Sequence, residues 1–102
     1  MVKVPNFKKF TGCYTVKGAS KWAKQDDAGQ QIEFIVSQRK QPTAKKPKDF
    51  LLYRIGNSRP QYFSSIYSND TGQKWVEYGG VHYSLDIKPQ QVCISYMGAD
   101  AD

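Results

Sequence analysis

The dipeptide Gly79-Gly80 constrains the fold of this chain more than any other feature of the sequence. Alternating runs of apolar and polar residues lie on both sides of it, over 73–78 and 81–87. A tight two-residue connection between antiparallel strands requires positive φ, which glycine adopts without steric cost. We therefore predict a hairpin in which the two residues that flank the glycines pair with each other, and this register fixes every later pair.

The predicted register assigns the side chains of the hairpin to two faces. One face is apolar and is the expected core face: Val76, Tyr78, Val81, Tyr83 and Leu85. The other face is polar except for Trp75, whose indole then lies among hydrophilic neighbours. An exposed aromatic ring on a sheet face is what base stacking requires. The alternative is that the chain termini or a basic loop cover the ring.

Period-two alternation continues through most of the chain, with β-branched and aromatic residues enriched. It predicts seven strands: 10–16, 31–38, 49–55, 61–67, 73–78, 81–87 and 91–96. Residues 20–27 are the one helix candidate, with Ser20 as its cap. We predict an all-β domain over 1–102, either a small antiparallel barrel (OB-like or SH3-like) or a compact sandwich, with five to seven strands and at most one short helix.

Composition excludes two broad classes. Of 102 residues, 39% are hydrophobic and 24% are charged, which is unlike a disordered chain. No apolar run approaches the roughly 18 to 20 residues that span a bilayer. Residues 1–9 hold three lysines without an apolar block behind them, so we expect no signal peptide and a cytoplasmic location. Residues 98–102 are expected to form a short, frayed acidic tail.

Cys13 and Cys93 are too few for a disulfide scaffold and too far apart in sequence for a zinc knuckle. Both lie in apolar stretches, so we expect small, reduced residues within the fold. A disulfide that joins the two ends of the chain is the alternative in an oxidising compartment.

Positive charge is concentrated in the first part of the chain. The net charge is +6, yet residues 1–59 hold thirteen of the fifteen basic residues and only four acidic ones. Such asymmetry is typical of proteins that contact nucleic acid or another polyanion, although it also serves solubility alone. Segment 39–48 has five cations, no acid and two prolines. It is predicted to be a flexible arm that follows a phosphate backbone, or else a solvated loop.

A second group of lysines surrounds the first predicted strand, with Trp22 among them. In the predicted interface the cations hold phosphates, while Trp75 and Trp22 stack on bases. Its residues are Lys8, Lys9, Lys21, Trp22, Lys24, Arg39, Lys40, Lys45, Lys46, Lys48 and Trp75. Five aromatic residues lack a certain core position: Trp22, Phe50, Phe63, Tyr67 and Trp75. If two or three of them share one face near the basic segment, they form a stacking platform with an electrostatic rim.

Catalytic signals are weak. The single histidine, His82, is predicted opposite Glu77, which on an exposed strand is usually an ordinary cross-strand contact. The sequence contains no glycine-rich phosphate loop, no HExxH and no CxxC. We predict no enzyme, no catalytic residue, no metal and no cofactor.

The sequence thus predicts a non-catalytic protein that binds single-stranded DNA or RNA with weak sequence preference. The alternative is a small accessory or inhibitor module of a mobile element, whose basic part docks an acidic partner protein. An open edge strand would serve that role, or would serve homodimerisation. No membrane partner is expected.

Overall fold

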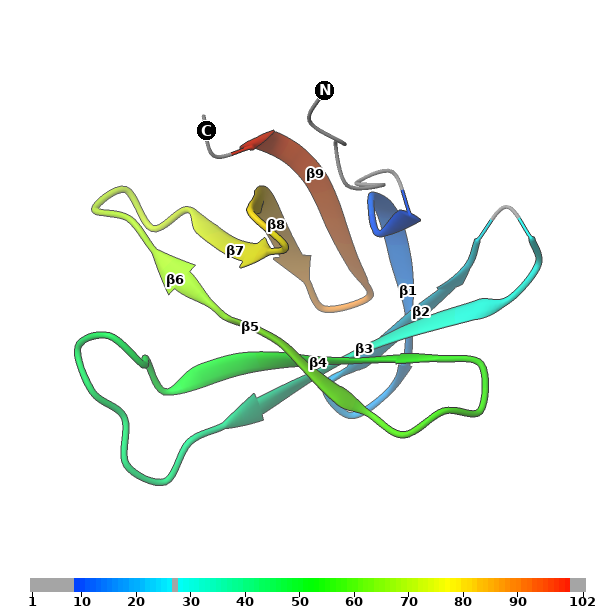
Figure 1. Cartoon of the computed structure of the whole chain (residues 1–102), viewed down its shortest axis with the longest axis horizontal. Coiled ribbons are helices and arrows are strands. Elements are labelled where there is room, and N and C mark those ends of the chain that lie inside the picture. Colours follow the sequence, from blue (N-terminus) through cyan, green and yellow to red (C-terminus); the bar gives the residue numbers. More distant parts are fainter. Residues whose placement is uncertain (1–8, 27, 100–102) are drawn as a thin grey trace.

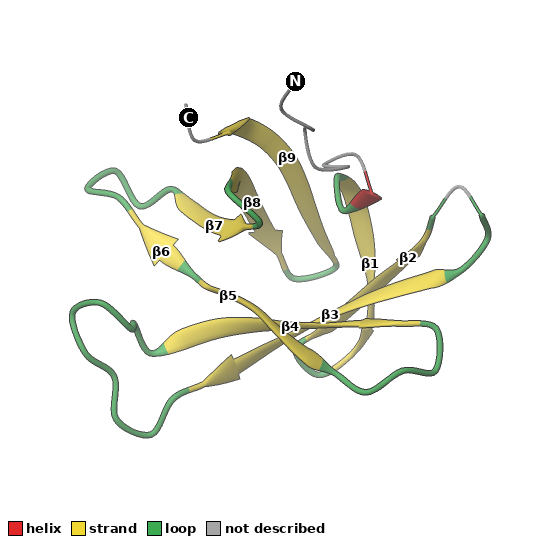
Figure 2. Ribbon diagram, in the orientation of Figure 1, coloured by secondary structure: helices red, strands yellow, loops and turns green. Residues whose placement is uncertain are grey.

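The structure is a computed structural model that describes residues 9–26 and 28–99. This part of the chain forms nine antiparallel strands (Figure 2). It contains no α-helix, and the short helical segment drawn just before β1 is a 3₁₀ turn at Lys9. The strands are β1 (Gly12–Gly18), β2 (Lys21–Gln25), β3 (Gln31–Gln38), β4 (Asp49–Ile55), β5 (Gln61–Ser65), β6 (Tyr67–Ser68), β7 (Lys74–Tyr78), β8 (Val81–Lys88) and β9 (Gln91–Ala99). The predicted all-β class is confirmed, but the number of strands exceeds the predicted five to seven.

The nine strands belong to one sheet, in the order β5-β4-β3-β2-β1-β9-β8-β7-β6. Its two ends meet because β5 and β6 follow each other in the chain, with Ile66 between them. β5 pairs with β4 and β6 pairs with β7, and the Glu77 amide donates to Ser64 Oγ at 3.0 Å across the remaining gap. The sheet is therefore a nearly closed antiparallel barrel, as Figure 1 shows.

The Gly79-Gly80 hairpin has the predicted register. Tyr78 pairs with Val81 and Trp75 with Ser84, while the two glycines adopt φ of 60° and 81°. On the predicted core face, Val76, Val81, Tyr83 and Leu85 are buried and Tyr78 is half-buried. The prediction of this hairpin and of its inner face is confirmed.

The barrel interior is filled largely by aromatic rings. Phe63 stacks on Tyr78 with centroids 4.4 Å apart and also packs edge-on against Phe34 at 4.9 Å. Tyr14 is fully buried, and its hydroxyl donates to the Phe10 carbonyl at 2.8 Å. This bond satisfies the one polar atom of a ring that would otherwise be costly to bury.

The predicted helix at 20–27 is wrong, because most of that segment is β2. Ser20, with φ of 57°, lies in the turn between β1 and β2, and β2 then pairs with strands on both sides. Trp22 lies opposite Phe34 and is buried, so its side chain fills the core. Sheet pairing on both sides outweighs the weak helical preference of so short a segment.

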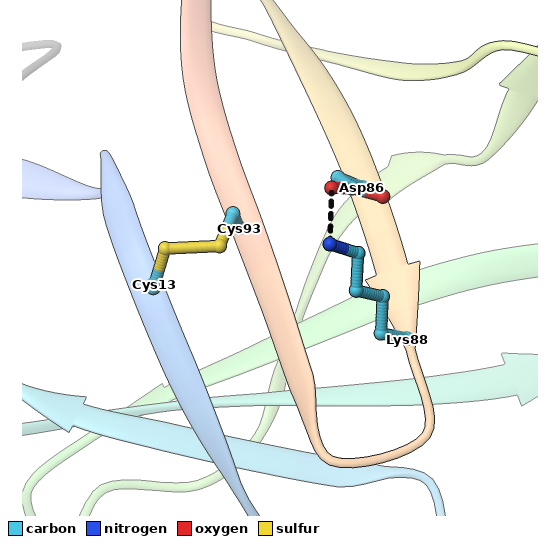
Figure 3. Close-up of a disulfide and its surroundings, with 4 residues drawn as sticks. All are labelled: Cys13, Asp86, Lys88 and Cys93. Carbon is cyan, nitrogen blue, oxygen red and sulfur yellow. Dashed lines mark ion pairs between the residues drawn. A yellow bond between two sulfur atoms is a disulfide. The ribbon is translucent and has the colours of Figure 1, made fainter.

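The expectation of reduced cysteines is also wrong. Cys13 on β1 and Cys93 on β9 are direct cross-strand partners with Cα atoms 4.0 Å apart, and they form a disulfide (Figure 3). Disulfides persist in oxidising compartments, so this bond does not agree with the expected cytoplasmic location. Within residues 9–26 and 28–99, no helix has the length and apolar character needed to cross a bilayer.

The prediction of a frayed tail is wrong for residues 98 and 99. β9 continues to Ala99, so residues 98 and 99 belong to a strand that pairs with β8. The rest of the predicted tail, 100–102, lies outside the described residues.

Candidate nucleic-acid interface

Trp75 lies on the outer face of β7, in a row of three rings. Because Val76 points into the core, its neighbour Trp75 points outward, where it is half-buried. Tyr67, its partner on β6, stacks on the indole with centroids 4.5 Å apart and planes 26° apart. The His82 ring on β8 lies 5.5 Å from the indole on the other side. We call these three residues the Trp75 row.

A second aromatic group lies on the outer face of β4 and β5. Leu51 fills the core, so Phe50 points outward, and Tyr62 on β5 does the same opposite Leu52. The rings of Phe50 and Tyr62 are 5.9 Å apart. The Arg39 guanidinium carbon lies 4.9 Å from the centroid of the Phe50 ring and 5.8 Å from that of Tyr62. We call Arg39, Phe50 and Tyr62 the Tyr62 platform.

Arg39 is held in place by hydrogen bonds as well as by the two rings. Nη1 donates to the Pro47 carbonyl at 2.6 Å, while Nη2 donates to the Tyr62 hydroxyl at 3.1 Å and to Ser65 Oγ at 3.2 Å. The Arg39 amide donates to the Lys48 carbonyl at 2.7 Å, which closes the base of the basic loop. Arg39 was predicted as a phosphate ligand. The structure gives it a second role as the residue that joins the loop to the platform.

Segment 39–48 connects β3 to β4 and is folded back on itself. Thr43 and Lys46 exchange backbone hydrogen bonds of 2.8 and 3.2 Å, and the Lys46 amide also contacts Thr43 Oγ1 at 3.0 Å. The segment is thus a loop closed by its own hydrogen bonds. Its four lysines are all exposed: Lys40, Lys45, Lys46 and Lys48.

The basic loop and the two aromatic groups meet near the start of β6. The Ile66 amide donates to the Asp49 carbonyl at 3.0 Å, so the residue before Tyr67 contacts the residue after Lys48. Tyr62 and Tyr67 lie on the successive strands β5 and β6. In Figure 1 the loop and β6 lie on the same side of the barrel, at the left of the view. The Trp75 row, the Tyr62 platform and the loop lysines therefore border one outer surface.

The other predicted site residues have different surroundings. Trp22 is only 8% exposed and cannot stack on a base, which corrects that prediction; β2 lies inside the sheet and its inward face forms core. Lys24 Nζ lies 5.6 Å from the Tyr14 ring centroid and Lys9 Nζ lies 5.8 Å from that of Phe10, so both cations cap core rings. Lys21 is exposed on β2, and Lys8 lies outside the described residues.

Sequence reasoning missed Tyr62. The signal was present, because 61–67 was predicted as a strand and neighbouring residues of a strand point to opposite faces. An inward Phe63 therefore implies an outward Tyr62. Phe50 and Tyr67 were noted as aromatic residues without a certain position, and the structure places both on the outer surface beside the basic loop.

The predicted Glu77–His82 pair lies on the neighbouring strands β7 and β8. The two residues are cross-strand partners, as the hairpin register requires. In the described part of the chain, no group of three or more His, Cys, Asp and Glu side chains is placed to hold a metal ion.

The tyrosines with shifted pKa values belong to the barrel interior. A hydrogen bond between the hydroxyls of Tyr78 and Tyr53, together with burial, raises the pKa of Tyr78 to about 12. Burial raises the pKa of Tyr14 and of Tyr83. These hydroxyls stay neutral at physiological pH, so they add no charge to the outer surface.

The chain matches no protein-family model, no curated protein and no solved structure. Any functional conclusion must therefore come from the chemistry of the outer surface.

Proposed function

We propose that this protein binds single-stranded DNA or RNA, without catalysis and with weak sequence preference. The observation that carries the proposal is the outer surface on which the Trp75 row, the Tyr62 platform and four exposed loop lysines lie together. Stacking platforms beside cationic grooves are how small barrels bind single strands. Every base has a π-face and every nucleotide a phosphate, so such contacts do not depend on sequence.

Local charge favours one direction for the bound strand. Glu77 is exposed on β7 two residues from Trp75, on the same face, and would repel phosphates on that side. The base of the basic loop lies beside Ile66, where the Ile66 amide donates to the Asp49 carbonyl, and the exposed lysines of the loop carry the opposite charge. We therefore expect the phosphates to lie toward Lys40, Lys45, Lys46 and Lys48, with the bases directed toward the rings.

Tryptophan fluorescence tests the proposal directly. Trp22 is buried and Trp75 is half-buried, so quenching by a short oligonucleotide reports mainly on Trp75. We expect quenching at low salt and a linear fall of log affinity with log salt concentration. Trp75→Ala, followed by fluorescence anisotropy of a labelled oligonucleotide, is expected to cost about 1 to 3 kcal/mol of binding free energy.

A matched pair of charge variants provides the control. Lys45→Ala removes an exposed loop cation. It is expected to reduce the slope of log affinity against log salt concentration by the amount that corresponds to about one phosphate contact. Lys88→Ala removes another exposed lysine, at the end of β8, where it pairs with Asp86, and is expected to leave the slope unchanged. If wild-type protein neither quenches nor binds a single strand at low salt, the proposal is wrong.

A protein-docking module is the second candidate, and one observation favours it. Cross-strand pairing aligns Lys21, Ile35, Leu52 and Tyr62 across β2 to β5, on the outer face. This mixed row of apolar and cationic side chains suits an acidic protein partner. A discrete stoichiometric complex with such a partner, combined with no retention on oligonucleotides at low salt, would favour this function over the first.

A further inference from the structure

We propose that the Tyr62 platform is a second base-stacking subsite, separate from the Trp75 row. The ligand would then be an unpaired strand that runs along the outside of β5 and β6 and contacts both subsites. This inference rests on the proposed function and adds to it a defined path and a minimum ligand length.

The Tyr62 ring is both accessible and fixed. The residue is 52% exposed, while its hydroxyl is within hydrogen-bond distance of Arg39 Nη2 at 3.1 Å and of Ser65 Oγ at 2.9 Å. Phe50 lies against it in a tilted arrangement. A ring already ordered in this way loses little conformational entropy when a base stacks on it, which favours binding.

Arg39 adds positive charge at a fixed position. Its guanidinium lies over the two rings and contacts the carbonyl of Pro47, so the cation stays at the junction between platform and loop. Guanidinium planes and aromatic rings are the groups on which unpaired bases stack in protein complexes with single strands. The platform thus combines a stacking surface with a charge that attracts the adjoining phosphate.

The distance between the subsites sets the length of the ligand. Tyr62 and Tyr67 are five residues apart along β5 and β6, which corresponds to at most about 17 Å at the usual rise per strand residue. If the segment is extended to that length, a single nucleotide does not reach both groups. Barrel domains that bind single strands cover about 4 to 16 nucleotides, and a strand of that length reaches both subsites.

The experiment compares two substitutions at Tyr62 on short and long ligands. Tyr62→Leu removes the aromatic ring but keeps an apolar side chain, whereas Tyr62→Phe keeps the ring and removes the hydroxyl. Anisotropy titrations use labelled oligothymidylates of about 3 and about 12 nucleotides, which bracket the lower range of such sites. Circular dichroism and the fluorescence of buried Trp22 check that each variant is folded.

We expect Tyr62→Leu to weaken binding of the long oligonucleotide by about 5- to 150-fold, as loss of one stacked base does, and Tyr62→Phe to weaken it much less. Wild-type protein should bind the long ligand far more tightly than the short one. Equal affinities of the Leu and Phe variants for the long ligand would overturn the second subsite, even if Trp75→Ala still weakens binding. Absence of any binding by wild-type protein would instead overturn the proposed function.

A duplex provides an independent measurement that needs no variant. Paired bases in a duplex are stacked on one another and cannot stack on protein rings at two separate points. We expect the single strand to compete at least about tenfold better than a duplex of the same length, because stacking adds to the phosphate contacts that both ligands share. Equal competition would mean that phosphate contacts alone hold the ligand, which would overturn the inference.

Discussion

Loss of the Cys13–Cys93 disulfide is expected to remove a large part of the stability of this protein. The bond joins residues 80 apart in the sequence, so it closes most of the described chain into one loop. Loop-closure entropy gives about 4.5 kcal/mol of stabilisation for a loop of this length at 25 °C. A domain of this size is typically stable by only about 5 to 15 kcal/mol, so the reduced protein would retain a small margin.

Urea denaturation with and without a thiol reductant measures this effect, with tryptophan fluorescence as the probe, since unfolding exposes the buried Trp22. With a urea m-value of about 1.5 kcal/mol/M, the loss corresponds to a fall of about 3 M in the midpoint. The double variant Cys13→Ala/Cys93→Ala should show the same low midpoint without reductant. Intact mass and thiol titration establish that the starting protein is oxidised. If an oxidised sample and its reduced form unfold at the same urea concentration, the chain-entropy reasoning is wrong.

Three further predictions concern stability. Gly80→Ala is expected to lower the free energy of unfolding by about 1 to 2 kcal/mol, because φ of 81° is unfavourable for alanine. Gly98→Ala is the control in the same denaturation assay, because neither a positive φ nor a close neighbour opposes a Cβ there. Lys17→Ala should lower the free energy of unfolding by about 1 to 3 kcal/mol, because it leaves the buried Glu33 carboxylate without its ion-pair partner at 3.0 Å. Glu33→Gln should lower it less, because water solvates the half-exposed Lys17 ammonium that remains. If Lys17→Ala and Glu33→Gln lower the free energy of unfolding equally, this reasoning is wrong. Tyr78 has a pKa raised from 10.0 to about 12, so its contribution to folding is complete below pH 10 and is lost as pH rises toward about 12; thermal melts of wild-type protein and Tyr78→Phe should converge over that range.

The hairpin could be predicted from the sequence because its determinants are local. Two adjacent glycines fix the turn, the turn fixes the register, and the alternation on either side fixes the core face. Trp75 was found in this way, as the one aromatic residue on a polar face. The stacking of Trp75 on Tyr67 could not be predicted in this way, because it depends on the pairing of β6 with β7.

The features that sequence reasoning missed depend on contacts between distant parts of the chain. The helix predicted at 20–27 is a strand because β1 and β3 supply hydrogen-bond partners on both sides. For the same reason Trp22, expected on the surface, lies in the core. The disulfide depends on the pairing of β1 with β9, which no local pattern reveals. Arg39 was predicted as a phosphate ligand only, since nothing nearby in sequence indicates that Tyr62 and Ser65 hold it.

The pairing of β1 with β9 has a consequence for biosynthesis. During translation, β1 cannot pair with β9 until the segment 91–99 has left the ribosome. A nascent chain therefore carries an unpaired backbone edge on β1 while the intervening seven strands are being made, and such edges recruit other chains. Premature termination before β9 would make that exposure permanent, so truncated products are expected to aggregate rather than persist as smaller folded barrels.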